Sequence, residues 1–177
     1  MILEIPEFSR RFAIATIGTV AQPAMIEADE DERGRLATRF NLISIDYLAV
    51  RSTLVLSGAG IIATGQLTAR VTQRCVATEE AVEARLNEFF SICFVPTLEG
   101  GDSADELEIT ADECDYVEHD GVAIDLGEAS AQTLALALNP FPRAQNATKT
   151  LQKAGVMSES EVIIGPFAAL RALKKPT

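Results

Sequence analysis

Three β-rich segments in the middle of the chain constrain its fold more than any other feature of the sequence. Leu48–Ser57 and Ile61–Val76 are separated only by Gly58-Ala59-Gly60, and we expect a β-hairpin because glycine readily adopts the backbone angles of a tight turn. Val82–Val95 starts with charges at alternate positions and becomes continuously apolar, as a strand does when it enters a core, and Pro96 ends it. A mainly antiparallel β-sheet is therefore predicted.

The residues before this sheet predict one further strand and one helix. Phe8–Ile17 has the alternating and β-branched residues of a strand, which Gly18 and Pro23 then interrupt. Ala28–Phe40 has acids in its first turn and arginines later, an order that favours a helix because it complements the helix dipole, although Gly34 weakens it.

The residues after the sheet predict a strand that runs directly into a helix. Val122–Asp125 is the short strand and Leu126–Leu138 the helix, in which Asp125 and Glu128 have the spacing of a capping box. Asn139-Pro140-Phe141-Pro142 ends this helix, because proline cannot donate the next hydrogen bond. We predict an α+β fold with a few short packed helices, in a single domain over residues 1–177, a length that buries a sizeable core without metal or disulfides.

Charge is strongly segregated along the chain, whose net formal charge is -11. Residues 99–120 contain no Lys or Arg and ten of the eleven excess negative charges, so the rest of the chain is nearly neutral; the ten are Glu99, Asp102, Asp105, Glu106, Glu108, Asp112, Glu113, Asp115, Glu118 and Asp120. We expect a mobile acidic loop over about 99–118, because such a segment buries too little apolar surface to offset its ordering entropy. The tail 143–177 is basic, with a short helix expected at Pro166–Lys175.

Cysteine usage and hydropathy predict a cytoplasmic protein that has no membrane partner. Cys75, Cys93 and Cys114 lie far apart and are odd in number, so they cannot all pair within one chain, which indicates a reducing compartment. The N-terminus lacks a basic region followed by an apolar one, and no stretch approaches the roughly 20 apolar residues of a membrane span. The net charge taken whole argues against a nucleic-acid partner, but its concentration in residues 99–120 changes that conclusion for the rest of the chain. We expect no DNA partner.

The sequence predicts neither a metal site nor a cofactor. The three cysteines and His119 could supply four zinc ligands, but they lack the close paired spacing of structural zinc sites. Gly58-Ala59-Gly60 is not followed by the Lys-Ser/Thr of a phosphate-binding loop, and the acidic loop lacks the residue order of a calcium loop. We therefore expect no cofactor and no metal.

A catalytic apparatus is also not evident, so we expect a protein that is not an enzyme. His119 lies between two acids beside Gly121, which is typical of a solvated turn. The alternative is a small thiol or hydrolase enzyme built around Cys75, whose pKa the preceding Arg74 could lower. That alternative requires a pocket with a base within roughly 3 Å of the sulfur.

One face of the strand predicted at Ile61–Val76 is polar. Alternation places Leu67, Ala69, Val71 and Cys75 on one side and the candidate partner-binding residues Gln66, Thr68, Arg70, Thr72 and Arg74 on the other. Such donors suit an RNA backbone or a polar protein surface, and the simpler alternative is an ordinary solvent face. With no Trp, two Tyr and Phe residues mostly in apolar contexts, we do not expect the aromatic platform of an RNA-recognition motif.

Three blocks of the sequence resemble the YceD family of large ribosomal RNA subunit accumulation proteins. Gly65–Pro96 is similar to the family's central signature, Ile124–Ala144 resembles its Ile-Asp-Leu-Gly-Glu block with a Leu/Ala helix and a Pro-aromatic-Pro-Arg end, and Gly165–Lys175 resembles its C-terminal end. The motif residues in this chain are Gly65, Cys75, Asp125, Leu126, Gly127, Glu128, Pro140, Pro142 and Arg143. Gln132 and Asn139 depart from the acids common at those positions, and the cysteine-rich C-terminus of some members is absent.

This resemblance implies a non-catalytic cytoplasmic factor for the synthesis, processing or stability of large-subunit ribosomal RNA. Its partner would be that RNA, precursor RNA included, or a basic ribosomal protein drawn to the acidic loop. The positive charge for RNA would come from Arg70, Arg74, Arg85, Arg143 and Lys174-Lys175.

Overall fold

The structure is a computed structural model of the whole chain, and it describes residues 6–58, 60–97 and 114–156. Its main element is a five-stranded sheet in the order β2-β3-β4-β5-β6, in which β2 to β5 are antiparallel neighbours and β6 runs parallel to β5. The strands are β2 (Gln22–Glu27), β3 (Ser44–Ser57), β4 (Gly60–Arg74), β5 (Ala81–Pro96) and β6 (Asp115–His119). The predicted hairpin and the α+β class are confirmed.

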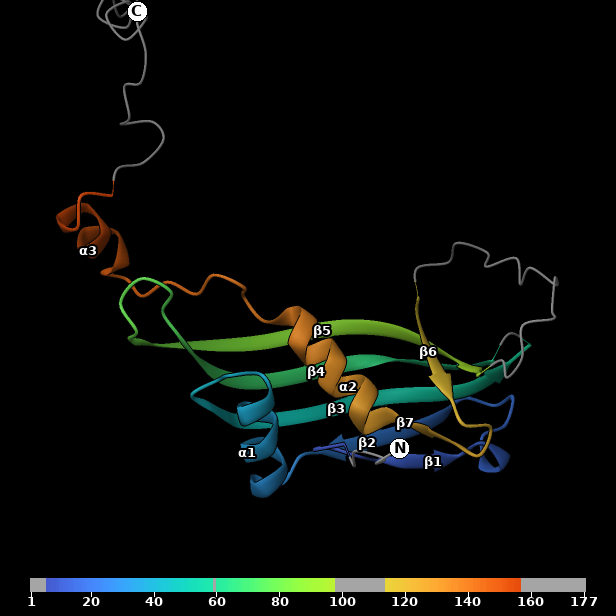
Figure 1. Cartoon of the computed structure of the whole chain (residues 1–177). Coiled ribbons are helices and arrows are strands. Elements are labelled where there is room, and N and C mark those ends of the chain that lie inside the picture. The colour runs from blue at the N-terminus through green and yellow to red at the C-terminus, as the bar shows by residue number, and fades with distance from the viewer. Residues whose placement is uncertain (1–5, 59, 98–113, 157–177) are drawn as a thin grey trace, which may run out of the picture.

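Three helices and a second, two-stranded sheet complete the described fold. The small sheet pairs β1 (Arg11–Ala13) with β7 (Ala123–Asp125), and the helices are α1 (Glu30–Arg39), α2 (Leu126–Ala137) and α3 (Ala147–Lys153). Figure 1 shows α2 lying across β3, β4 and β5 on one face of the large sheet, with α1 beside β3. No helix in the described ranges is long and apolar enough to cross a membrane.

The N-terminal prediction was wrong in two respects. Only Arg11–Ala13 of the expected strand is extended, and a 3-10 turn over Ile14–Thr16 follows it. Pro23 does not interrupt the chain but lies inside β2, opposite Thr53. A proline fits there because β2 is an edge strand, where a missing N–H leaves no ladder partner unsatisfied.

Both predicted helices are present, but their N-terminal caps differ from the prediction. In α1 the carboxylate of Asp29 accepts the N–H of Glu32, and the side chain of Glu32 accepts the N–H of Asp29, a full capping box that was not predicted. In α2, Asp125 accepts the N–H groups of Gly127 and Glu128, while the Glu128 carboxylate bonds to Arg39 instead of closing the box.

The acidic segment and the basic tail contain structure that was not predicted. Asp115–His119 forms β6, so the loop expected over about 99–118 ends earlier than predicted. Helix α3 lies in the basic tail just after the proline-rich stretch. Most of the acidic loop and the helix expected at Pro166–Lys175 lie outside the described residues.

The core lies between the large sheet and the helices. Alternate residues of β3 and β4 point into it, and they are fully or almost fully buried together with residues of α1 and α2; the largest include Leu48, Val50, Leu54, Leu67, Val71, Leu36, Leu126 and Leu134. We call this side of the sheet the covered face. Within the ladder Gly65 is required, because an added Cβ would lie 2.3 Å from the carbonyl oxygen of Arg51 on the neighbouring strand.

Candidate functional site

The opposite side of strands β2 to β5, which we call the open face, carries most of the predicted partner-binding residues. The ladder places Arg51 opposite Gln66 and Gln66 opposite Phe89, so these side chains share one face. Tyr47, Arg70 and Arg85 form a second row on the same face. The open face is defined by Met25, Glu27, Tyr47, Arg51, Thr64, Gln66, Thr68, Arg70, Thr72, Arg74, Glu83, Arg85, Asn87 and Phe89.

The predicted alternation along β4 is present in the structure. Thr68, Arg70 and Arg74 are exposed and Gln66 is half-buried, whereas Leu67, Ala69, Val71 and Cys75 are buried. Thr72 is the exception, because only 8% of it is exposed and it offers little to a partner. The hydroxyl of Thr68 lies 3.4 Å from the amide oxygen of Asn87 on β5.

Four arginines of the open face have no ion pair within the described part of the chain. They are Arg51, Arg70, Arg74 and Arg85, all exposed, whereas the ion pairs that are present use Arg10, Arg11 and Arg39. The acids at register positions of the same face of β2 to β5 are Glu27 and Glu83, so these strands present net positive charge in a chain of -11.

Arg70 and Arg85 face each other directly across the β4–β5 ladder. Like charges at directly opposite positions of a sheet are unfavourable unless acidic groups nearby offset their repulsion. The two side chains line a cavity of about 250 Å³ with Asp46 and Glu83, neither of which reaches ion-pair distance. The guanidinium of Arg70 also lies 5.7 Å from the centre of the Tyr47 ring.

Arg143 is brought to the end of β4 by two hydrogen bonds, one between backbone groups and one from a backbone N–H to a side-chain sulfur. The N–H of Val76 donates to the carbonyl of Pro142 at 2.9 Å, and the N–H of Ala144 donates to the sulfur of Cys75 at 3.3 Å. Arg143 lies between these two anchors and is exposed, close in space to the strand end that carries Arg74. The first two of the three sequence blocks that resemble the family, Gly65–Pro96 and Ile124–Ala144, therefore meet at Cys75.

Eight of the fourteen residues that define the open face were missed from the sequence, and Arg51 and Phe89 are the two of them that bear most on partner binding. Arg51 lies in the predicted Leu48–Ser57 strand, and the register between β3 and β4 pairs it with Gln66. Phe89 precedes Phe90 in β5, and the alternation of that strand distinguishes the two, because Phe90 is buried while 81% of Phe89 is exposed.

Cys75 lacks the surroundings of a nucleophile. The residue is fully buried, and its sulfur accepts N–H groups from Ala77 at 3.4 Å and Ala144 at 3.3 Å. The Ala144 N–H is the main reason that the pKa of the thiol is lowered to about 7, so the expected effect of Arg74 was wrong. Thr78 contributes through its hydroxyl, although this buried oxygen has no hydrogen bond of ordinary geometry within the described chain. None of these groups is a base.

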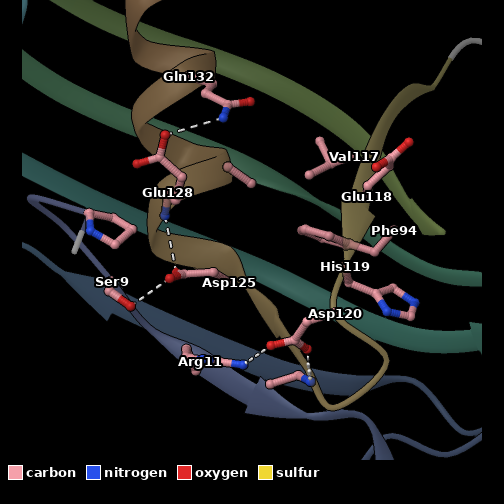
Figure 2. Close-up of a pocket in the computed structure, with 13 residues that line it drawn as sticks. Ser9, Arg11, Phe94, Val117, Glu118, His119, Asp120, Asp125, Glu128 and Gln132 are labelled. Atoms are coloured by element: carbon pink, nitrogen blue, oxygen red, sulfur yellow. Dashed lines mark hydrogen bonds and ion pairs between the residues drawn. The ribbon is translucent and has the colours of Figure 1, made fainter. Parts of the chain in front are cut away.

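A cavity of about 570 Å³ lies on the other side of the molecule, between β6, β7 and the start of α2. Figure 2 shows Asp120, Asp125 and Glu128 around it, with Phe94 and Val117 on its wall. Most of its polar groups already bind other parts of the fold.

Three polar residues of this cavity form hydrogen bonds within the fold. Asp125 accepts hydrogen bonds from Ser9 and Arg10, and Asp120 accepts the N–H groups of Val122 and Ala123, which lower its pKa to about 2 with help from Arg11. His119, predicted as a solvated turn residue, is the half-buried last residue of β6, and its Nδ1 accepts the N–H of Gly121 at 3.0 Å.

Most family-motif residues hold the fold together in this chain. A Cβ at Gly127 would lie 2.7 Å from the carbonyl oxygen of Phe8, so α2 can approach the N-terminal segment only with glycine there. Leu126 and Pro142 are buried, and Glu128 pairs with Arg39 at 2.8 Å. Pro140 and Arg143 are exposed. Across the described ranges, no group of three His, Cys, Asp or Glu residues is arranged to hold a metal ion.

Comparison with known proteins gives one match. The family model described as "Large ribosomal RNA subunit accumulation protein YceD" matches residues 63–174. No curated protein and no solved structure matches the chain. The match begins inside β4 and extends beyond α3, so it includes the whole polar strip on β4, all of β5 and the helix α2.

Proposed function

The chain belongs to the YceD family of large ribosomal RNA subunit accumulation proteins, and on that premise we propose that it is a non-catalytic cytoplasmic factor that supports this RNA by binding it directly through the open face. Its contribution would be to the synthesis, processing or stability of large-subunit ribosomal RNA, precursor RNA included. The single observation that carries the proposal is the set of four exposed arginines on one sheet face that have no ion pair among the described residues.

Unpaired arginines on a flat polar face suit a phosphate backbone. Arginine presents a fork of donors that matches phosphate geometry, and neutralising phosphates releases counterions, which supplies most of the affinity of such complexes. Thr68 and Gln66 lie between the arginines of β4 and of β3 and add neutral donors. The directly opposite pair Arg70 and Arg85 adds to this set, because it places two guanidinium groups close together, although Asp46 and Glu83 line the same cavity.

The alternative to RNA as the partner is a basic ribosomal protein. Electrostatic attraction would then come from the acidic segment, most of which lies outside the described residues. The described residues favour RNA, because the open face carries four exposed arginines against the two acids Glu27 and Glu83 at its register positions.

The proposal is tested by fluorescence anisotropy with a fragment of large-subunit ribosomal RNA at low and physiological salt. We expect salt-sensitive binding by the native chain and about a tenfold or greater loss for Arg70→Glu/Arg74→Glu. The control Lys149→Glu/Lys153→Glu makes the same change in net charge at exposed positions of α3, and we expect it to lose much less.

Two outcomes would contradict this proposal. Equal losses in the two double variants would mean that bulk charge and not the open face determines binding. Absence of binding at low salt would remove RNA as the partner, and anisotropy with a labelled basic ribosomal protein would then test the other class.

An enzyme built around Cys75 remains the alternative from a different class. The buried sulfur and its backbone donors do not favour it, and the prediction that the chain is not an enzyme stays a prediction. In a cell that lacks the native protein, Cys75→Ala should still restore large-subunit RNA levels if the variant folds. Loss of that activity, with native stability and RNA affinity retained, would favour the enzyme.

A further inference from the structure

We propose that the open face takes unpaired, single-stranded RNA and that Phe89 is the platform on which one of its bases stacks. This inference rests on the proposed function and adds the class of RNA and a residue that the sequence did not identify. It starts from the exposure of Phe89, a large apolar side chain in the middle of a long strand, of which 81% is accessible.

Phe89 is one of two largely exposed phenylalanines among the described residues, and it is the one that lies on the sheet, whereas Phe141 follows α2. Phe8, Phe90 and Phe94 are all buried, and Phe90 is the immediate neighbour on the same strand. The alternation of β5 sends Phe90 into the core and leaves the Phe89 ring on the open face, where it gains none of the transfer free energy of burial. The ring is therefore available to a partner.

The neighbours of Phe89 are polar, which distinguishes this position from an apolar docking patch. Gln66 lies directly opposite it on β4, and Asn87 and Ser91 are its same-face neighbours along β5. Met25 is the other exposed apolar residue in this row, with 70% accessible, but Arg51 and Gln66 separate the two across the sheet. A second protein copy would find no continuous apolar surface here.

Phosphate-binding groups lie on two sides of the ring at distances that suit one RNA strand. Arg85 is four residues away on β5, or about 13 Å at the rise of an extended strand. Arg51 is two strands away in the same row, or about 10 Å at the usual strand spacing. A base on Phe89 would thus have one arginine along the strand and one across the sheet within reach of the RNA backbone.

The bases of a duplex cannot use such a platform, because they already stack on one another inside the helix. Single-stranded segments expose their faces, and proteins that bind them combine an aromatic ring with basic groups along the backbone. The amides of Gln66 and Asn87 lie next to the ring, where the edge of a stacked base would meet them.

The experiment compares an unstructured pyrimidine 12-mer RNA with the duplex that it forms with its complement, by fluorescence anisotropy at one salt concentration. The variants are Phe89→Leu, Phe89→Trp and the control Phe141→Leu, which removes an aromatic ring with 69% accessible outside the open face. We expect tighter binding to the single strand, about a tenfold loss for Phe89→Leu, near-native affinity for Phe89→Trp and no change in the control.

The outcomes separate this inference from the proposed function. Equal affinity for strand and duplex, with Phe89→Leu unchanged, overturns the stacking platform and leaves an RNA-binding face. Absence of binding to either RNA overturns both. A change in oligomeric state in Phe89→Leu, measured by analytical ultracentrifugation, would show that Phe89 contacts a second copy and would also overturn the platform.

Discussion

The two faces of the large sheet are made from the same strands but differ in the burial of their side chains. On the covered face, Leu67, Ala69 and Val71 of β4 are almost fully buried against the helices. On the open face, the intervening Thr68 and Arg70 are exposed. Side chains alternate along a strand, so neighbours in sequence have separate roles: one set determines stability and the other is free to meet a partner.

The two faces also differ in whether their arginines form ion pairs. Near the covered face, Arg10 donates to both carboxylate oxygens of Glu32 at 2.6 and 2.8 Å, and Arg39 bonds to Glu7 and Glu128. On the open face, no arginine of the described chain has such a partner. Paired charges tie α1 and α2 to the N-terminal segment, whereas unpaired charges contribute nothing comparable to the fold.

The largest expected effect comes from truncating adjacent residues on opposite faces. Leu67→Ala should lower the free energy of unfolding by about 3 kcal/mol, because the side chain is fully buried and leaves a cavity. Thr68→Ala should change it by less than about 0.5 kcal/mol. Urea unfolding followed by circular dichroism measures both, and similar values for the two would remove the distinction between the faces.

A smaller effect is expected from neutralising one member of an ion pair. Glu32→Gln should cost about 2 kcal/mol, because Glu32 is 8% exposed and binds both Arg10 and the N–H of Asp29. Arg70→Gln on the open face should cost less than about 0.5 kcal/mol. Thermal unfolding measures the stability of both variants. A larger loss of stability for Arg70→Gln than for Glu32→Gln would contradict the distinction between paired and unpaired charges.

The smallest effect is the pH dependence of stability. Arg10 lowers the pKa of Glu32, and the N–H groups of Ala123 and Val122 lower the pKa of Asp120 to about 2. A carboxylate whose pKa is lower in the folded state stabilises the fold above its unfolded pKa, and this contribution is lost as the pH falls through the folded value. The urea midpoint should therefore fall between about pH 5 and pH 2.

Measuring the urea midpoint against pH in Glu32→Gln and Arg70→Gln shows which groups cause the decrease. The decrease should be shallower in Glu32→Gln, which has lost one of the responsible groups. It should be unchanged in Arg70→Gln, and an altered profile there would indicate a carboxylate partner for Arg70.

Features set by local periodicity could be predicted from the sequence. The hairpin, the polar strip on β4, the strand β5 and the start of α2 follow from alternation, turn residues and a cap, all of which act over a few residues. The edge strands were not predicted, because Pro23 and the acids around β6 weaken the local strand signal, while pairing with a neighbour in the sheet offsets it.

Contacts between distant segments could not be predicted. Glu128 has the spacing of a capping box, but Arg39, 89 residues away, takes its carboxylate. Cys75 follows Arg74 in sequence, but the N–H of Ala144 acts on its thiol. Candidate residues of the open face were identified along β4 and at Arg85 of β5, whereas Arg51 and Phe89 belong to it only through the register of neighbouring strands.

The most direct test of the central claim is to locate the RNA on the molecule. The native chain is mixed with a large-subunit ribosomal RNA fragment at physiological salt, irradiated with ultraviolet light and digested, and the crosslinked peptides are identified by mass spectrometry. We expect crosslinks at open-face residues of β3 to β5, with Tyr47 and Phe89 among them. Crosslinks confined to α1, α2 or the cavity beside β7 would contradict the account.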